Sequence, residues 1–267
     1  MKRVTGKTKK RQKRGLGTGK NYNPWIHCRE VRSKGTKSLL VDWKHGRQIH
    51  LLSRNETYMY FILRWNDDVV DIREQYPLNR TTTNKIADAL GITHPRLWND
   101  PNECMTTDFL VTVNENGIEK TKAISVKNSY IDVFGDENKP KVKRRIEIQS
   151  IEMNYWQLKG VDFKIKFGDR DINKVFARNI EVIVNYYDLK NVHSLHEFML
   201  YLLAHKYIEV DLEKEPLNVQ KLISQYLVNA EQIKNWIAVI SKPERLRIEE
   251  QLELEKEILN SVIVNMG

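Results

Sequence analysis

The alternation of apolar and polar residues predicts an α/β layer structure in the first part of the chain. Side chains alternate in four segments, as they do in half-buried strands: 69–78, 105–113, 120–127 and 161–167. Glu115-Asn116-Gly117 between the second and third segments is a hairpin turn sequence. Helices are expected at 56–65, 83–90 and 144–159. The order of helix, three-strand meander, helix and strand predicts a mixed sheet with packed helices.

The pattern becomes helical after Gly168-Asp169-Arg170-Asp171. Four helices are expected in this part, at 172–187, 195–205, 219–230 and 243–264. Short strands or an ordered arm are expected within 22–50, and a mobile loop at the polar stretch 128–142. The predicted organisation is therefore a basic arm, an α/β domain and a mainly helical C-terminal domain, at residues 1–20, 21–168 and 169–267.

Charge is concentrated at the N-terminus. The net charge of the chain is +9, and residues 1–20 contain nine basic side chains and no acid, so the remainder is neutral overall. Such a segment has little to bury and is expected to be disordered and to contact nucleic acid, although a solubility or localisation tail would look the same. The candidate DNA contacts are Lys9, Lys10, Arg11, Lys13 and Arg14, with a second cluster at Lys143 and Arg144.

Several classes of protein do not fit the composition. No apolar stretch approaches 18 residues, so a membrane span is not expected. The two cysteines, Cys28 and Cys104, form no zinc spacing with the histidines and are typical of a reducing, cytoplasmic compartment.

Acidic and basic side chains are predicted to meet where the second and third strands begin and end. Asp108 begins the second strand and Lys127 ends the third, so a hairpin places them at one sheet edge. Ser125 shares a strand face with Lys127, and the Val126 carbonyl can point to the same edge. Mg²⁺ prefers oxygen ligands such as the Asp108 carboxylate and the Val126 carbonyl. Hydrolysis of a phosphodiester at neutral pH needs a divalent cation of this kind. The alternatives are structural: Asp108 capping the hairpin, and Glu56 closing a capping box with Ser53.

Six segments then resemble the TnsA family of transposon-end endonucleases in order and spacing. They are Lys20–Trp25, His50–Glu56, Val70–Leu78, Met105–Val111, Ile124–Lys127 and Tyr155-Trp156-Gln157. The resemblance implies a restriction-endonuclease-like core and a winged-helix-type C-terminal domain. It also implies cleavage of the 5′ strand at transposon ends, with a TnsB-type transposase and a TnsC-type AAA+ ATPase as partners.

The resemblance also implies roles for individual residues. Glu56 matches the family's helix carboxylate, Asp108 its principal metal ligand and Lys127 its catalytic lysine, around Mg²⁺ for which Mn²⁺ can substitute. Glu152 matches an acidic position near the site, although a solvated helix carboxylate is an equal interpretation. Ser125 departs from the family's usual Gln, which puts metal affinity in question.

Three other functions stay open. Ser125 could mark a DNA-binding adaptor that no longer cuts, and the same core occurs in free-standing nucleases. A nuclease that uses histidine to bind its metal is a weaker alternative, with candidates His45, His50 and His94.

The acidic amphipathic stretch 249–259 predicts a helix that docks a partner or packs internally.

Overall fold

The computed structural model describes residues 4–31 and 35–227 of the protein. The chain divides into two compact units, with the boundary between Ile172 and Asn173. The first unit is mixed α/β and the second is helical in its described part. Short 3₁₀ turns join the larger elements, at Gly19–Asn21, Cys28–Glu30, Leu97–Asn99, Val184–Tyr186 and Leu189–Asn191.

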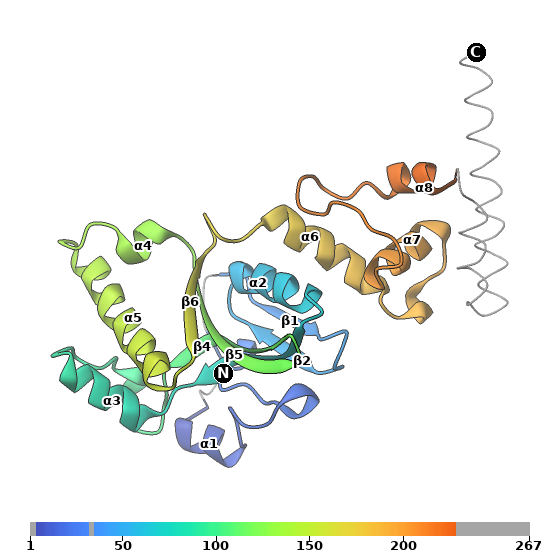
Figure 1. Ribbon diagram of the computed structural model, residues 1–267. Helices are drawn as coiled ribbons and strands as arrows, with labels where there is room; N and C mark the ends of the chain where they lie inside the picture. Colours follow the sequence, from blue (N-terminus) through green and yellow to red (C-terminus); the bar gives the residue numbers. More distant parts are fainter. Residues whose placement is uncertain (1–3, 32–34, 228–267) are drawn as a thin grey trace. The chain divides into compact units, whose positions relative to one another are not determined.

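A four-stranded sheet forms the centre of the first unit (Figure 1). Its strands follow in chain order: β3 (Val69–Pro77), β4 (Thr106–Glu115), β5 (Ile118–Lys127) and β6 (Asp162–Phe167). The first two pairings are antiparallel and β5–β6 is parallel, so the predicted mixed sheet is confirmed. Asn116 and Gly117 join β4 to β5 with φ angles of 54° and 83°, the left-handed geometry that two-residue hairpin turns require.

Helices cover both sides of this sheet. Figure 1 shows α3 (Arg80–Ala89) and α5 (Pro140–Leu158) on one side, and α2 (Arg54–Trp65) with the β1–β2 hairpin (Ser38–Val41, Gln48–Leu51) on the other. The core beneath α3 and α5 is apolar and consists of Leu78, Ile86, Ala87, Met105, Leu110, Ala123, Ile151, Tyr155 and Trp156. Burial of such side chains is the main favourable term in folding, so this layer fixes α5 against the start of β4.

The stretch 128–142 is helical over much of its length, contrary to the expected mobile loop. It contains α4 (Tyr130–Phe134) and the first turn of α5, which begins at Pro140. Val133 and Val142 are buried, and these two apolar residues among many charges give each helix an inward face. Proline at the first helical position needs no N–H partner and starts α5 without cost.

The N-terminal segment is docked on the first unit, which corrects the expectation of a disordered arm. Thr5 caps α1 (Gly6–Arg11), and the N–H of Gly6 donates to Asp100 Oδ2 at 2.8 Å. A side chain at Gly6 would meet the backbone carbon of Asn102 at 2.4 Å, so the segment lies directly against that loop. Charge counting missed this arrangement because the acidic partners lie outside the segment: Glu30 is 16 residues from Arg14, and Glu103 is 94 residues from Lys9.

The second unit has its own apolar core. It contains α6 (Lys174–Ile183), α7 (Leu195–Ala204) and α8 (Val219–Leu227), close to where helices were predicted. The buried Asn179 amide donates to the carbonyls of Leu212 and Glu215 and thereby holds the segment between α7 and α8. No strand occurs among residues 173–227, so the described part shows no wing. The predicted helix at 243–264 and the acidic stretch 249–259 lie outside the described residues.

Among the residues that the structure describes, no helix has the length and apolar character needed to cross a membrane.

Candidate active site

β4 and β5 separate at the edge where the candidate residues lie. The last residues paired in register are Phe109 and Ile124. Beyond them, the side chain of Asp108 takes the place of the backbone ladder: its Oδ2 accepts the N–H of Val126 at 2.6 Å. A carboxylate that accepts a backbone N–H is fixed in orientation, so Asp108 is held at the point where the strands part.

Lys127 and Asp108 face each other across this opening. The Lys127 ammonium lies 3.5 Å from Asp108 Oδ2 and 3.4 Å from the Val126 carbonyl oxygen. Ser125 lies between them: its hydroxyl donates to Asp108 Oδ2 at 3.3 Å and accepts from Lys127 Nζ. The serine is 1% exposed, so this bridge is shielded from water. The structure therefore brings together Asp108, Ser125, Val126 and Lys127, as the hairpin geometry predicted.

Glu56 reaches the same site from the first turn of α2. Its carboxylate accepts from the Leu52 N–H and the Ser53 hydroxyl, both at 2.9 Å, so the predicted link with Ser53 at the start of the helix is present. The Gln75 side-chain amide donates a third hydrogen bond, at 3.1 Å. Burial, followed by the charge on Asp108, raises the pKa of Glu56 to about 8. Glu56 therefore serves both as a helix-capping residue and as one of the titratable groups that meet at this site.

Glu152 approaches from α5 on the other side of Asp108. It is 4% exposed and accepts from the Thr107 hydroxyl at 2.7 Å and the Gln149 amide at 2.9 Å. Trp156 Nε1 donates in turn to the Thr107 hydroxyl at 2.7 Å. Burial raises the pKa of Glu152 despite the nearby Lys127 ammonium. Glu152 is thus a buried, fully hydrogen-bonded carboxyl, and the solvated alternative does not describe it.

The ammonium of Lys127 is the cation that lies near the acidic groups of Asp108, Glu152 and Glu56. Burial acts to lower its pKa, but the charges of Asp108, Glu152 and Glu56 outweigh burial, so the pKa is raised above its ordinary value. Lys127 is therefore a cation at neutral pH. A fixed ammonium stabilises negative charge that develops on a nearby oxygen, such as a phosphate oxygen.

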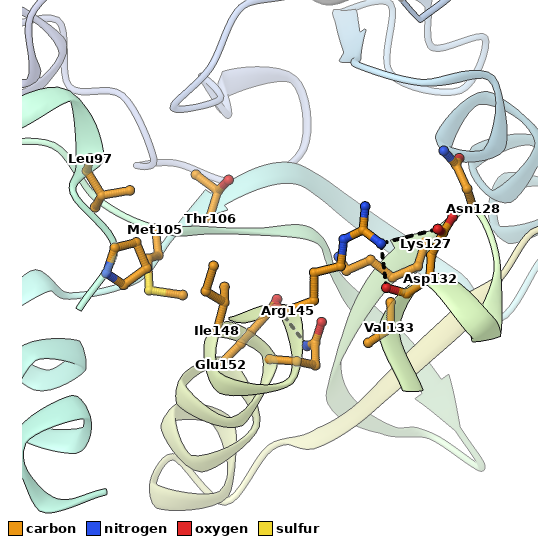
Figure 2. A pocket seen from close by; sticks show the side chains of 12 residues that line it. Leu97, Met105, Thr106, Lys127, Asn128, Asp132, Val133, Arg145, Ile148 and Glu152 are labelled. Atoms are coloured by element: carbon orange, nitrogen blue, oxygen red, sulfur yellow. Dashed lines mark hydrogen bonds and ion pairs between the residues drawn. The ribbon is translucent and has the colours of Figure 1, made fainter. Parts of the chain in front are cut away.

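A cavity of about 460 Å³ opens beside Lys127 and Glu152 (Figure 2). Its floor is apolar, with Met105, Val133 and Ile148, and the side chain of Arg145 lines it as well. Arg145 is held by the carbonyl of Asp132 at 2.6 Å and by the carboxylate of that residue at 3.2 Å. The two basic side chains therefore line one hollow.

Comparison with known proteins agrees with this geometry. Residues 66–167 match the family described as the N-terminal part of TnsA-like endonucleases. The chain contains a TnsA-like endonuclease N-terminal domain. The curated transposition protein TnsA of transposon Tn7, from Escherichia coli, is 39% identical over 168 residues, which cover 63% of this chain and 58% of that protein. The chain thus matches less than two thirds of the length of that relative.

The matched segment of the TnsA-like domain contains most of the cluster. Asp108, Ser125, Lys127 and Glu152 lie inside it, whereas Glu56 precedes it. The family match therefore covers the β4–β5 edge and α5, and the structure adds α2 to this site.

The donor set of the TnsA-like domain fits a hard divalent cation. Within the described part of the chain, the contacts of Asp108 use Oδ2, which leaves the lone pairs of Oδ1 for a further ligand. The Val126 carbonyl faces the same opening. Ser125 is less suited, because Lys127 already occupies its hydroxyl oxygen. Among the described residues, no three His, Cys, Asp or Glu side chains gather closely enough to hold a metal ion. Mg²⁺ is commonly held by one or two protein oxygens, with water and phosphate as further ligands.

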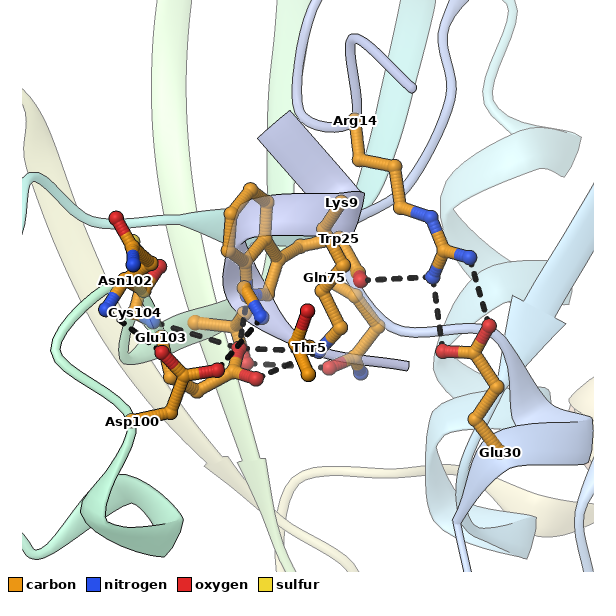
Figure 3. A network of polar contacts seen from close by, with 12 residues as sticks. Thr5, Lys9, Arg14, Trp25, Glu30, Gln75, Asp100, Asn102, Glu103 and Cys104 are labelled. Atoms are coloured by element: carbon orange, nitrogen blue, oxygen red, sulfur yellow. Dashed lines mark hydrogen bonds and ion pairs between the residues drawn. The ribbon is translucent and has the colours of Figure 1, made fainter. Parts of the chain in front are cut away.

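Two residues proposed to contact DNA are instead buried in ion pairs of the first unit (Figure 3). Lys9 is 6% exposed, and its ammonium lies 3.0 Å from both carboxylate oxygens of Glu103. Arg14 is 5% exposed and binds the carboxylate of Glu30 through both terminal nitrogens, at 2.8 and 2.7 Å. Their charges are neutralised inside the protein, so these two assignments are corrected: they hold the N-terminal segment in place.

The other basic candidates lie at the surface. Lys10 donates to Asn102 Oδ1 at 3.1 Å, and the remaining exposed ones are Arg11, Lys13 and Lys143. Arg144 is half-buried and pairs with Glu147 at 2.8 Å. The structure therefore leaves the exposed lysines and Arg11 available to a polyanion.

Sequence reasoning missed Gln75 in the TnsA-like domain. It lies in β3, is 1% exposed and has a φ of 49°. A glutamine within an alternating strand gives no sign of a left-handed backbone, since glycine or asparagine is the usual residue there. The spacing of Glu74 and Gln75 could only have suggested that one of them faces solvent, yet both are buried.

Proposed function

We propose that the protein is a Mg²⁺-dependent DNA endonuclease that cuts the 5′ strand at transposon ends during cut-and-paste transposition. The observation that carries this proposal is the opening between β4 and β5, where Asp108, Ser125 and Lys127 meet within the matched endonuclease segment. An acid, a backbone carbonyl and a lysine at one sheet edge supply what hydrolysis of a phosphodiester requires.

Each side chain has a distinct role in this proposal. Asp108 and the Val126 carbonyl hold the cation, for which Mn²⁺ substitutes. When bound, the cation neutralises charge on the scissile phosphate and lowers the pKa of the attacking water. Lys127 orients that water or stabilises the charge that develops on the phosphate. Glu56 completes the ligand set from α2, and Glu152 keeps the Lys127 ammonium charged.

The finer architecture is part of the same proposal. A four-stranded mixed sheet with helices on both sides supports a restriction-endonuclease-like core within residues 21–168. The separate helical unit supports a mainly helical C-terminal domain, residues 169–267. That this domain is of winged-helix type and docks DNA or a partner is proposed from the family resemblance. We further propose that the acidic stretch 249–259 contributes to docking.

The proposed partners follow from the named relative. TnsA of Tn7 is a transposition protein, so we propose that this chain acts in the cytoplasm with a TnsB-type transposase and a TnsC-type AAA+ ATPase on transposon-end DNA. Lys10, Arg11, Lys13 and Lys143 are exposed and supply the phosphate contacts in this proposal, with Arg144 beside them.

Cleavage by the assembled complex tests the proposal. The protein is incubated with a TnsB-type and a TnsC-type protein of the same transposon, end-containing DNA and Mg²⁺, and the 5′ ends are mapped. Wild type should cut, and Asp108→Asn should not, because an amide neither carries the charge nor binds the cation as strongly. Asp162→Asn is the matched control, because it makes the same change at an exposed residue at the start of β6, outside the β4–β5 edge and the cavity wall. Undiminished cutting by Asp108→Asn would remove Asp108 from the mechanism.

A second candidate function is a DNA-binding adaptor that does not cut. It is favoured by Ser125, whose hydroxyl oxygen is taken up by Lys127 and is a poor substitute for a longer ligand. Calorimetric titration with Mn²⁺ separates the two functions. An endonuclease should take up Mn²⁺ in wild type and lose this uptake in Asp108→Asn, whereas an adaptor should show no uptake that depends on Asp108.

A further inference from the structure

The backbone of β3 departs from strand geometry beside the cluster. Gln75 lies between Glu74 and Tyr76, and the register of those neighbours places it opposite Asp108 on β4. Its φ of 49° is in the left-handed region, which costs free energy for a residue with a side chain. Glycine would adopt this conformation without that cost. A buried glutamine kept in this state indicates that its side chain is needed where the kink directs it.

The kink sends two consecutive side chains to the same part of the molecule. Neighbouring residues in a regular strand point to opposite faces. Here the carboxylate of Glu74 binds the Arg47 guanidinium and the backbone N–H of His50, which lies in β2. The amide of Gln75 binds Glu56 in α2, the helix that follows β2 in the chain. Without the left-handed turn, the amide of Gln75 would point away from Glu56.

The amide of Gln75 is fixed at both ends. Its Oε1 accepts from the Thr106 hydroxyl at 3.2 Å, and its Nε2 donates to Glu56 Oε2 at 3.1 Å. Its backbone carbonyl accepts the Trp25 N–H at 3.2 Å. The side chain thus connects the start of β4, next to Asp108, to the carboxylate on α2.

We propose that Gln75 is a positioning residue, whose left-handed backbone and bridging amide hold the Glu56 carboxylate toward Asp108 and Lys127. The inference rests on the proposed nuclease function for its effect on catalysis, but not for the placement itself. Among the described residues of β3, Gln75 is the one that donates a hydrogen bond to Glu56. Loss of the amide should therefore leave Glu56 with its bonds to Leu52 and Ser53 alone and loosen its placement toward Asp108, while the fold is retained.

Gln75→Gly tests this inference, because glycine removes the amide and also removes the backbone cost. The relief of backbone strain offsets the loss of two hydrogen bonds and of buried volume, so the variant should unfold at a denaturant concentration close to that of wild type. Its single-turnover cleavage should nevertheless fall about tenfold, the worth of one buried hydrogen bond. Asn116→Gly is the matched control: it replaces another left-handed residue, at the far hairpin turn, and should cleave like wild type.

Two readouts separate positioning from a purely structural role. In a Glu56→Gln background, Gln75→Gly should cost nothing further, because the group to be positioned has been altered. In the NMR spectrum of the DNA-free protein, the side-chain amide protons of Gln75, assigned by their absence in Gln75→Gly, should move upfield in Glu56→Ala.

The outcomes also distinguish this inference from the proposed function. Amide protons that do not respond to Glu56→Ala overturn the inference, whether or not the protein cuts DNA. Additive losses in the double variant, or full cleavage by Gln75→Gly, overturn it as well. Absence of cleavage by wild type in the complete complex would refute the nuclease function instead, while the NMR result would still decide the contact.

Discussion

Replacement of Lys9 should destabilise the protein, although this residue belongs to a strongly basic N-terminal segment. Lys9→Met keeps the length of the side chain and removes only the ammonium. In wild type that ammonium lies 3.0 Å from both carboxylate oxygens of Glu103, and the two side chains are 7% and 5% exposed. It also lies 5.4 Å from the centroid of the Trp25 ring. The variant therefore removes the ammonium that pairs with the buried Glu103 carboxylate.

The size of the effect follows from burial. Removing one partner of a buried ion pair costs about 3–5 kcal/mol. Glu103 keeps hydrogen bonds from Trp25 Nε1 and from the Cys104 N–H, which places the expected loss near the lower end, about 3 kcal/mol. For a unit of this size each kcal/mol lowers the melting temperature by about 2–4 °C, so a decrease of about 6–12 °C is expected.

Lys10→Met is the matched control, since Lys10 is the next residue and carries the same charge. Its ammonium makes one exposed hydrogen bond, to Asn102, so the free energy of unfolding should change by less than about 0.5 kcal/mol. Both variants lose one charge, so their net charges are identical. Urea unfolding followed by tryptophan fluorescence measures the difference, and Glu103→Gln completes a double-mutant cycle with Lys9→Met.

Equal unfolding midpoints for Lys9→Met and Lys10→Met would refute the reasoning. That result would mean that the segment is not docked through Glu103, and a solvated arm in which all lysines are equivalent would then explain the sequence better. A coupling free energy close to zero in the double-mutant cycle would lead to the same conclusion, because a buried ion pair must be strongly non-additive.

Three further predictions concern the site, the pH dependence and the docked segment. Lys127→Met should slow single-turnover DNA cleavage about hundredfold or more while DNA affinity in a gel-shift assay stays within about threefold, because charge stabilisation is lost at one point. Burial, then the charge of a neighbouring imidazole, lowers the pKa of His50 to about 4, and its Nδ1 accepts the Cys28 N–H. The unfolded state binds the imidazole proton of His50 more tightly, so the free energy of unfolding falls as the pH drops from about 6.5 toward 4. His50→Gln should remove up to about 3 kcal/mol of that loss, as measured by urea unfolding at several pH values. Parallel pH profiles of wild type and variant would contradict this prediction. Gly6→Ala should cost about 1–3 kcal/mol by urea unfolding, because its Cβ would meet the Asn102 backbone at 2.4 Å; a wild-type midpoint would show that the contact is loose.

Much of the first unit was predictable because its signals are local. The alternation of β3 to β6 and the Asn116-Gly117 turn fix a hairpin, and a hairpin fixes which ends lie together. Asp108 and Lys127 therefore met at one edge as predicted, from spacing alone. The hydrogen bond between Ser53 and Glu56 at the start of α2 could also be predicted from the sequence, because it spans a single helical turn.

The parts that could not be predicted depend on contacts between distant residues. Lys9 and Glu103 are 94 residues apart, so a local count of charges shows only an unpaired basic run. The left-handed backbone of Gln75 has no signature in sequence, since tertiary hydrogen bonds and not the residue's own preference maintain it. For Glu152 the resemblance implied a place near the site, but its position in sequence could not exclude a solvated carboxylate, because its hydrogen bond to Thr107 spans 45 residues.

These distant contacts converge on Trp25, which is why the docked segment matters to the site. Its indole N–H donates to Glu103, its ring lies beside Lys9, and its backbone N–H donates to the carbonyl of Gln75. The residue is 2% exposed, so none of these bonds competes with water. A strained backbone persists only where its surroundings over-determine it. The hydrogen bond from Trp25 supplies one of those constraints on β3, and the side-chain amide of Gln75 is hydrogen-bonded in turn to Glu56. Two basic residues of the N-terminal segment, Lys9 and Arg14, therefore contact the residue that connects the segment to β3.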